Sequence, residues 1–304
     1  SVDPLKVTVE DLQAHAIPIM RNLLQAHVNC YRAIQEHDKI DADGDGVPAR
    51  VGMTIGTGMT RPADKNNPKD VAAALQTQFA STFQFTDAVM FGEVHYDYDG
   101  SVDEMRADWA GTLDMYGVQY YASSVVVGFP INGLLEGVPC IPLGDPTVTE
   151  LMLQLGCPPP SADDWPLGEP EDKALYGMQH DPAGLLELLR TIHQRYPDLP
   201  LVITENGFAN DPVKRAHSLV RHLKVCHEAL EEGLPLEGYY HWSLLDNFEW
   251  GRGFGVRFGL FEVDFAGDLA RTPTLAVDIY RDIASHHGLT QSLLDSFGGQ
   301  GALR

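Results

Sequence analysis

The chain has 304 residues, of which 44% are hydrophobic and 21% charged, and its 43 acidic against 21 basic residues give a formal net charge of −22 at pH 7. This length and composition allow a large buried core and are typical of a soluble α/β protein with one or two domains. The acidity argues against nucleic acid or an anionic membrane as a partner, and no apolar run approaches the roughly 18 residues that span a bilayer.

The start of the chain shows no secretory signal, which predicts a cytoplasmic protein, although Ser1 in place of an initiating Met leaves the natural N-terminus open. Cysteines occur at Cys30, Cys140, Cys157 and Cys226 without any Cys-x-x-Cys pair. In a chain of this size they are expected to be reduced thiols rather than a disulfide framework or a zinc site.

The first predicted element is a helix within residues 8–37, followed by a polar loop. Pro18 suits the first turn of its main segment, after which side chains that can face a core recur at helical spacing. These side chains are Ile19, Leu23, Leu24, His27 and Tyr31.

Asp41, Asp43 and Asp45 in the following loop imitate the start of a calcium-binding loop. Such a loop carries a bidentate glutamate at its twelfth position, and that position is Gly52 here. Calcium binding and an acidic surface turn are the two interpretations, and the missing glutamate favours the turn.

Strand and helix patterns alternate along the remainder of the chain, which predicts parallel βα units. Pro68 to about Phe91 is expected to be helical, and Ser101-Val-Asp-Glu104 is a capping box that predicts a short helix after it. The predicted strands are 51–56, 116–122, 201–205 and 238–244.

Three later helices are marked by an N-cap residue directly before a proline. The segment 129–180 is rich in proline and glycine and is expected to be a long functional loop, and residues 289–304 a peripheral tail. The helix before that tail should end near Gly288, and the one before it at the C-cap glycine Gly233. The three dipeptides are Asp181-Pro182, Asp211-Pro212 and Thr272-Pro273.

The most informative strand is Leu201-Val-Ile-Thr, which runs directly into Glu205-Asn206-Gly207. A short apolar run after a proline predicts a buried parallel strand, and in barrels of such strands the chemistry lies where strands end. A catalytic carboxylate and a glutamate that caps the next helix are both compatible with this stretch alone.

A second stretch, Gly238-Tyr-Tyr-His-Trp-Ser-Leu-Leu-Asp-Asn-Phe-Glu-Trp-Gly251, decides between them. Together the two stretches closely resemble the signatures of glycoside hydrolase family 1, the retaining β-glycosidases. The resemblance implies an α/β fold built from parallel (βα) units of a TIM (β/α)8 barrel. It covers most of the chain but only the C-terminal half of that barrel, strands five to eight, as a single domain over residues 1–304.

In this family the glutamate of Ile-Thr-Glu-Asn-Gly is the nucleophile, which implies that role for Glu205. Tyr121 corresponds to the tyrosine that hydrogen-bonds the nucleophile and stabilises its carboxylate. Gln119 stands where the family usually has asparagine, and its extra methylene puts the carry-over of that contact in doubt.

The resemblance also implies a sugar site around the second stretch. Glu249 matches an acidic residue that accepts hydrogen bonds from sugar hydroxyls, and Trp242 and Trp250 match aromatic walls for a pyranose ring. Glu249 would repel a phosphate, so the expected substrate is a neutral β-linked sugar. His241 alternates with Trp242 and is expected to face the other way, as a packed histidine.

The acid/base of the family lies in an Asn-Glu-Pro motif that this sequence lacks; its one Glu-Pro is Glu169-Pro170, preceded by Gly168. One hypothesis is therefore the nucleophile-bearing half of a retaining β-glycosidase, completed by the N-terminal half of the barrel or by self-association. The alternative is a non-catalytic, sugar-binding or self-assembling half-barrel. Neither hypothesis includes a cofactor or a metal ion.

Overall fold

The computed structural model describes residues 12–42, 44, 46–96, 100–131, 134–140, 146–157 and 180–299. Asp43 and Asp45 of the acidic loop lie outside the described residues, so the choice between calcium binding and a surface turn stays a prediction. Asp41 accepts hydrogen bonds from the backbone amides of Gly44 and Gly46, as expected for an aspartate that organises a turn.

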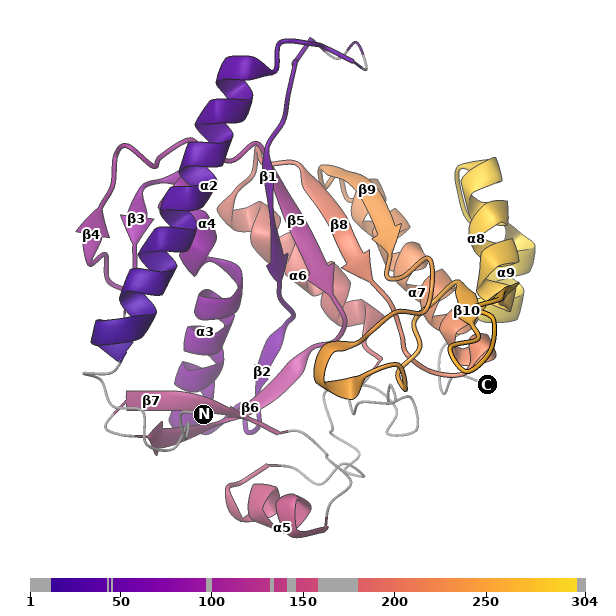
Figure 1. The fold of residues 1–304 in the computed structure, drawn as a ribbon. Helices are drawn as coiled ribbons and strands as arrows, with labels where there is room; N and C mark the ends of the chain where they lie inside the picture. Colours follow the sequence, from indigo (N-terminus) through magenta and orange to yellow (C-terminus); the bar gives the residue numbers. More distant parts are fainter. Residues whose placement is uncertain are drawn as a thin grey trace.

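The centre of the fold is a parallel sheet whose strands come from the predicted positions (Figure 1). All three neighbouring pairs are parallel, which confirms the predicted βα units. The last strand is displaced from its predicted bounds, because it runs from Leu236 to His241 rather than from residue 238 to 244. In order across the sheet, the strands are β1 (Gly52–Gly56), β5 (Met115–Tyr120), β8 (Leu201–Asn206) and β9 (Leu236–His241).

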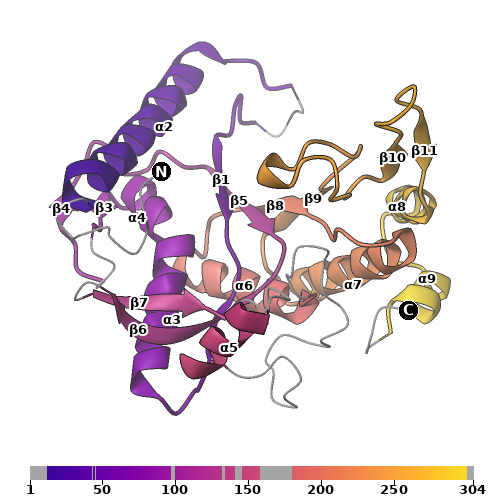
Figure 2. The ribbon, with the colours of Figure 1, turned by 60° about the horizontal axis from the view of Figure 1, so that its bottom comes forward.

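Helices form an arc around one side of this sheet (Figure 2). Between them and the strands lies the largest apolar core, in which Val118, Leu201, Ile203 and Leu185 are completely buried. Burial of such side chains contributes about 1.5–3 kcal/mol each. The helices are α2 (Ile17–His37), α3 (Pro68–Thr82), α4 (Gln84–Met90), α6 (Pro182–Arg195), α7 (Pro212–Glu231) and α8 (Leu275–His286).

Smaller elements lie around the central sheet. Within the described residues, three short sheets and two further helices lie outside it, and one turn of π-helix precedes α2. The sheets are β2 (Thr60–Pro62) with β6 (Ser124–Ile131) and β7 (Leu134–Pro139), β3 (Glu93–Val94) with β4 (Glu104–Met105), and β10 (Phe261–Val263) with β11 (Arg271–Pro273). The helices are α5 (Pro146–Gln154), α9 (Gln291–Phe297), the π-turn η2 (Leu12–Ala16) and the 3-10 turn η3 (Trp250–Arg252).

Two of the three predicted N-caps are confirmed. Asp181 accepts a hydrogen bond from the amide of Gly184, and Asp211 accepts from Val213 and Lys214. The helix after Asp211 ends where expected, because Gly233 adopts a positive φ of 83° just beyond it.

The third predicted cap, Thr272-Pro273, is wrong. These residues belong to β11, whose partner β10 supplies the backbone hydrogen bonds, and α8 starts at Leu275 after Thr274. Antiparallel pairing with β10, a few residues earlier in the chain, has overridden the local helix signal.

The helix expected after Ser101–Glu104 is also wrong, since Glu104 lies in β4, opposite Val94. Its carboxylate is engaged by the guanidinium of Arg21 at 3.1 Å and by the hydroxyl of Tyr96, so it does not cap a helix. The helix predicted from Pro68 to Phe91 is present but is divided into α3 and α4 at Phe83.

The prediction of four reduced thiols is wrong for one pair. Cys140 follows β7 and Cys157 follows α5, and a disulfide joins them with their Cα atoms 5.6 Å apart. Both are buried against Val125 and Val127 of β6, a contact that linear spacing does not reveal. Cys226 is a free, buried thiol whose pKa burial raises to about 12, which makes it unreactive at neutral pH.

The expected long loop at 129–180 is only partly a loop. Its first part completes the antiparallel pair β6–β7, and α5 follows at Pro146–Gln154. Residues 158–179 lie outside the described part of the chain. In the expected tail, α9 packs on α7, where the ring of Phe297 lies 5.0 Å from that of His217.

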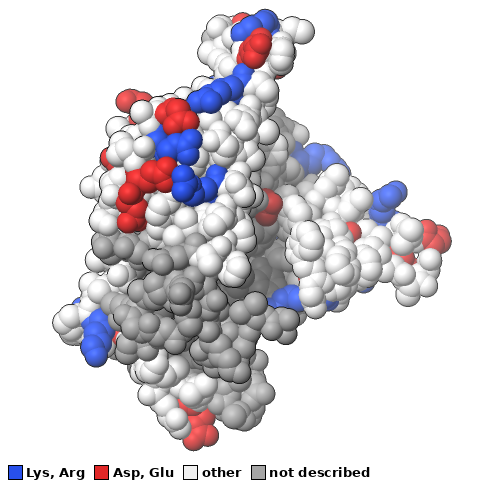
Figure 3. Space-filling model, turned by 60° about the vertical axis from the view of Figure 1, so that its left-hand side comes forward, with Lys and Arg blue, Asp and Glu red and all other residues white. Residues whose placement is uncertain are grey.

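The first helix buries only part of the predicted face, on which His27 and Tyr31 are half-buried. Leu24 and Val28 are buried, whereas Ile19 and Leu23 are 60% and 58% exposed. Figure 3 views the molecule from the side of α2, and acidic and basic side chains lie next to each other in the upper part of this face.

The sheet has an open edge on each side within the described residues, since β1 pairs only with β5 and β9 only with β8. Open edges and exposed apolar side chains are characteristic of surfaces that pack against another part of a protein. Among the described helices, none is long and apolar enough to cross a membrane.

Candidate active site

Glu205 lies at the carboxyl end of β8, on the edge of the sheet where the chemistry of parallel βα folds occurs. The register of β8 against β5 shifts by one residue here, so that Ile203 pairs with Val118 but Glu205 pairs with Gln119. A bulge re-aims the side chains that follow it. Glu205 and Gln119 therefore lie side by side.

The carboxylate of Glu205 is held by two donors from β5 and the residue after it. Gln119 Nε2 donates to Oε1 at 2.7 Å, and the hydroxyl of Tyr121 donates to Oε2 at 2.6 Å. The expected neighbour Tyr121 thus lies in place, and the longer side chain of Gln119 still reaches the carboxylate. Two donors, one on each oxygen, fix the orientation of the carboxylate.

Asn206, the residue after Glu205, links its own strand β8 to the neighbouring strands β5 and β9. Its Nδ2 donates to the carbonyl oxygen of Tyr120 at 2.9 Å, and its Oδ1 accepts from the hydroxyl of Tyr239 at 2.7 Å. A Cβ at Gly207 would lie 2.0 Å from the carbonyl oxygen of Trp242, so only glycine allows this close approach of the chain after β9.

The second stretch, residues 238–251, contributes the remaining residues predicted for the site. The indole Nε1 of Trp242 donates to Oε1 of Glu249 at 3.2 Å, which orients the carboxylate without neutralising it. Trp250 follows with a positive φ of 50° and is 83% exposed, so its ring is available at the rim.

All six residues predicted for the site line one cavity of about 600 Å³. The prediction from sequence missed Arg252, Val256 and Phe258, which complete the lining together with Gly251. Arg252 comes two residues after Trp250 in sequence, but Phe258 carries no local signal: its ring meets that of Tyr121 at 5.8 Å only in the folded chain. The site combines two carboxylates, aromatic surfaces and one guanidinium.

His241 faces away from this cavity, as expected, into a buried group of imidazoles. It is not among the residues that line the cavity, and burial lowers its pKa to about 4. Burial lowers the pKa of His222 to about 4 as well and that of His180 well below its usual value. The rings of His180 and His222 lie 5.0 Å apart. These histidines are neutral packing groups rather than proton donors at the site.

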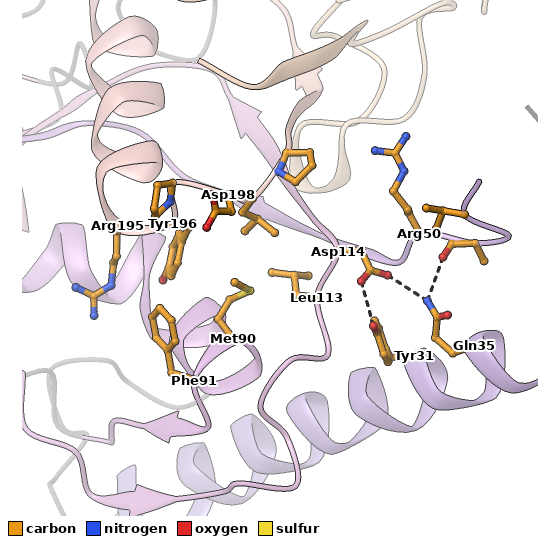
Figure 4. Close-up of a pocket in the computed structure, with 15 residues that line it drawn as sticks. Tyr31, Gln35, Arg50, Met90, Phe91, Leu113, Asp114, Arg195, Tyr196 and Asp198 are labelled. Carbon is orange, nitrogen blue, oxygen red and sulfur yellow. Dashed lines mark hydrogen bonds between the residues drawn. The ribbon is translucent and has the colours of Figure 1, made fainter. Parts of the chain in front are cut away.

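A second cavity, of about 540 Å³, lies at the other end of the sheet, beside the starts of β5 and β8 (Figure 4). The carboxylate of Asp114 is held there by the hydroxyl of Tyr31 at 3.0 Å and by Nε2 of Gln35 at 3.2 Å. Apolar side chains, Met90, Leu113 and others, supply most of the remaining wall. These hydrogen bonds hold the carboxylate of Asp114 against α2.

Comparison with known proteins decides the family. The family model described as Glycosyl hydrolase family 1 matches residues 8–289. The chain belongs to glycosyl hydrolase family 1. A β-galactosidase of Pyrococcus woesei is 32% identical over 281 residues, which are 90% of this chain and 51% of that protein. β-Glucosidase 13 of Arabidopsis thaliana is 28% identical over 87% of this chain and 52% of its own length.

Solved structures of family 1 agree with the fold. The β-glycosidase from Pyrococcus horikoshii superposes with a TM-score of 0.73 at 28% identity, over 95% of this chain and 58% of that one. The family 1 β-glucosidase from Thermotoga maritima, at 24% identity, gives a TM-score of 0.68 and supports the fold. The chain thus consists of parallel (βα) units of a TIM barrel, and it spans about half the length of the curated relatives it matches.

The buried histidines of this family 1 chain make its stability depend on pH. An unfolded imidazole has a pKa near 6.5, whereas His222 and His241 have values of about 4 when folded. Below pH 6.5 the unfolded chain binds protons that the folded chain does not, so stability falls as the pH falls towards 4. We expect a loss of about 2 kcal/mol per histidine between pH 7.5 and pH 5.

Urea unfolding of the His241→Phe variant at both pH values measures this effect. The variant should lose less stability at pH 5 than the parent does, and the exposed-histidine control His227→Gln should behave like the parent. A parent whose unfolding midpoint is the same at both pH values would contradict the assignment of neutral buried imidazoles.

Proposed function

We propose that this chain carries the nucleophile and part of the sugar site of a retaining β-glycosidase that acts on neutral β-glycosides. The observation that supports this most directly is the carboxylate of Glu205, held by Gln119 and Tyr121 in a cavity with Trp242 and Glu249. The names of its relatives, β-galactosidase and β-glucosidase, agree with this substrate class.

Glu205 is the group that attacks the anomeric carbon and forms the glycosyl-enzyme intermediate. The donors on both of its oxygens fix its orientation, which reduces the reorganisation needed to reach the transition state. The hydroxyl of Tyr121 donates to the carboxylate of Glu205, whose charge is lost when the bond to the sugar forms and restored when that bond breaks.

Glu249, Trp242 and Trp250 bind the sugar. A pyranose presents C–H faces to aromatic rings and hydroxyl groups to carboxylates, and both kinds of partner are present on this wall. Because the indole of Trp242 holds Glu249 by one oxygen, the second oxygen is available to accept from a hydroxyl. A phosphate at that position would meet like charge.

The second carboxyl group comes from outside these 304 residues. Retaining hydrolysis needs an acid/base about 5–5.5 Å from the nucleophile, and the Asn-Glu-Pro motif that supplies it in the family does not occur here. We assign this group to the first half of the barrel, supplied by a preceding segment or by a separate chain that pairs with the open edges of β1 and β9.

The alternative is a non-catalytic protein that binds sugar or assembles with itself. The absent acid/base motif favours it for the isolated chain, and the arrangement of Glu205, Tyr121 and Gln119 favours the enzyme, because pure sugar binding does not need an aimed carboxylate.

The first prediction concerns Glu205. In the complete barrel, a 2-fluoro glycoside should label this residue, and Glu205→Gln should lower kcat/KM by roughly 10⁴-fold because an amide cannot attack the anomeric carbon. Peptide mapping by mass spectrometry locates the label. Glu237→Gln, at the other end of the sheet, is the matched control and should retain full activity. A label on a different carboxylate would refute the assignment of the nucleophile.

The second prediction concerns Glu249. The complete enzyme should prefer glucosides to 6-phosphoglucosides in kcat/KM, because the carboxylate accepts from a hydroxyl and repels a phosphate. Glu249→Gln should reduce kcat/KM for the glucoside. It should also lower the ratio of kcat/KM for the glucoside to kcat/KM for the 6-phosphoglucoside by at least about tenfold. Equal values for the two substrates in the parent enzyme would contradict this role.

The third prediction concerns the 304-residue chain by itself. It should turn over cellobiose about 10²–10⁴-fold more slowly than the complete enzyme, because the leaving oxygen departs unprotonated, whereas a nitrophenyl glucoside should lose less. It should also self-associate in light scattering through its open edges and the exposed Ile19 and Leu23 of α2.

Leu23→Lys should reduce this association, and Leu230→Lys, at a residue of α7 that is 52% exposed, is the matched control. A monodisperse monomer that hydrolyses cellobiose readily would show that the chain already contains its acid/base.

A further inference from the structure

Three side chains that commonly bind metal ions converge where α4 meets the β3–β4 hairpin. One ligand atom from each of Asp87, Glu93 and His95 lies within 4.8 Å of the other two. None of the three lines the active-site cavity. The cluster is therefore separate from the proposed glycosidase site and does not depend on that proposal.

His95 is the most informative member, because it is 2% exposed and its Nε2 has no hydrogen-bond partner within the described residues. Its Nδ1 bonds the carbonyl oxygen of Ser101, which can only accept, so Nδ1 carries the proton. In the neutral ring Nε2 then presents a lone pair. That lone pair faces Oδ2 of Asp87 at 3.7 Å, too far for a direct hydrogen bond.

Asp87 is completely buried, and its orientation is fixed from the opposite side. Oδ1 accepts from Nε of Arg195 at 2.8 Å and from the hydroxyl of Tyr196 at 2.6 Å, whereas Oδ2 accepts one N–H of Arg195. Each carboxylate oxygen has two acceptor sites, so Oδ2 keeps one for a further partner. Arg195 and Tyr196 also border the second cavity. The guanidinium of Arg195 points away from Leu113 and Asp114, which lie on the other side of that cavity (Figure 4).

The charges of the cluster favour a cation at its centre. Arg195 offsets the charge of Asp87, whereas no ion pair offsets that of Glu93 within the described residues. The imidazole lone pair of His95 also faces Oδ2 of Asp87. Two ligands about 2.1 Å from a tetrahedral metal ion lie about 3.4 Å apart, close to the observed 3.7 Å between Nε2 and Oδ2. Glu93 is half-buried, so its side chain can adjust and water can reach an open coordination position.

We propose that Asp87, Glu93 and His95 bind a divalent transition metal ion, with Zn²⁺ as the preferred occupant. An imidazole with two carboxylates suits Zn²⁺ better than Ca²⁺ or Mg²⁺, which take oxygen ligands. Arg195 and Tyr196, which donate to Asp87, and the carbonyl oxygen of Ser101, which accepts from His95, act as the outer partners that orient metal ligands. The ion would join α4 to the β3–β4 hairpin and thereby stabilise this corner of the fold.

Calorimetric titration of the chelator-treated 304-residue chain with ZnCl₂ at pH 7 tests the proposal. All proteins carry Cys30→Ser, because an exposed thiol is a competing zinc ligand. We expect one ion per chain and a rise in Tm on saturation, with no comparable response to MgCl₂ or CaCl₂. Glu93→Gln should weaken binding at least about tenfold, and His95→Phe should abolish it.

The matched control is Glu228→Gln, which removes the same charge from an exposed position of α7 and should leave zinc affinity unchanged. Because Glu93 is half-buried, its variant is informative even if His95→Phe fails to fold. Co²⁺ substitution gives a second measurement, since its visible absorption depends on the ligands and should change in Glu93→Gln. Absence of stoichiometric Zn²⁺ binding, or binding that survives both substitutions, would overturn the proposal.

Discussion

The carboxyl-terminal edge of the sheet depends on the side-chain amide of Asn206. It accepts from the hydroxyl of Tyr239 and donates to the carbonyl of Tyr120, so that β5, β8 and β9 are joined at one level. Both partners are neutral and the amide is buried, where a hydrogen bond left unmade costs about 1–3 kcal/mol. Register is thereby enforced, and Glu205 is placed opposite Gln119.

The proposed nucleophile and the proposed sugar ligand are held by different means. Glu205 receives hydrogen bonds on both oxygens from a neighbouring strand, which leaves little freedom to rotate. Glu249 is held by one oxygen from Trp242, seven residues away in the same segment. A group that must attack in one direction needs the first arrangement, and a group that accepts from hydroxyls of a bound sugar can use the second.

The half-barrel explains features that a complete α/β domain would not show. Open edges at β1 and β9 and the exposed apolar face of α2 have no internal partner within the described residues. The helices nevertheless bury a continuous core against the sheet, so this part of the family 1 fold positions half of a site by itself.

The amino-acid sequence by itself determined the parallel βα units, the aspartate caps of α6 and α7, and the family signatures around Glu205 and Glu249. These are local properties, set by periodicity, capping chemistry and the order of residues within one segment. Only the tertiary structure decided which face of α2 is buried, that Cys140 meets Cys157, that Glu104 pairs with Arg21 rather than capping a helix, and that Phe258 and Arg252 complete the cavity. The physical reason is distance along the chain: Arg21 and Glu104 are 83 residues apart, and contacts of that kind follow from packing that no local pattern encodes.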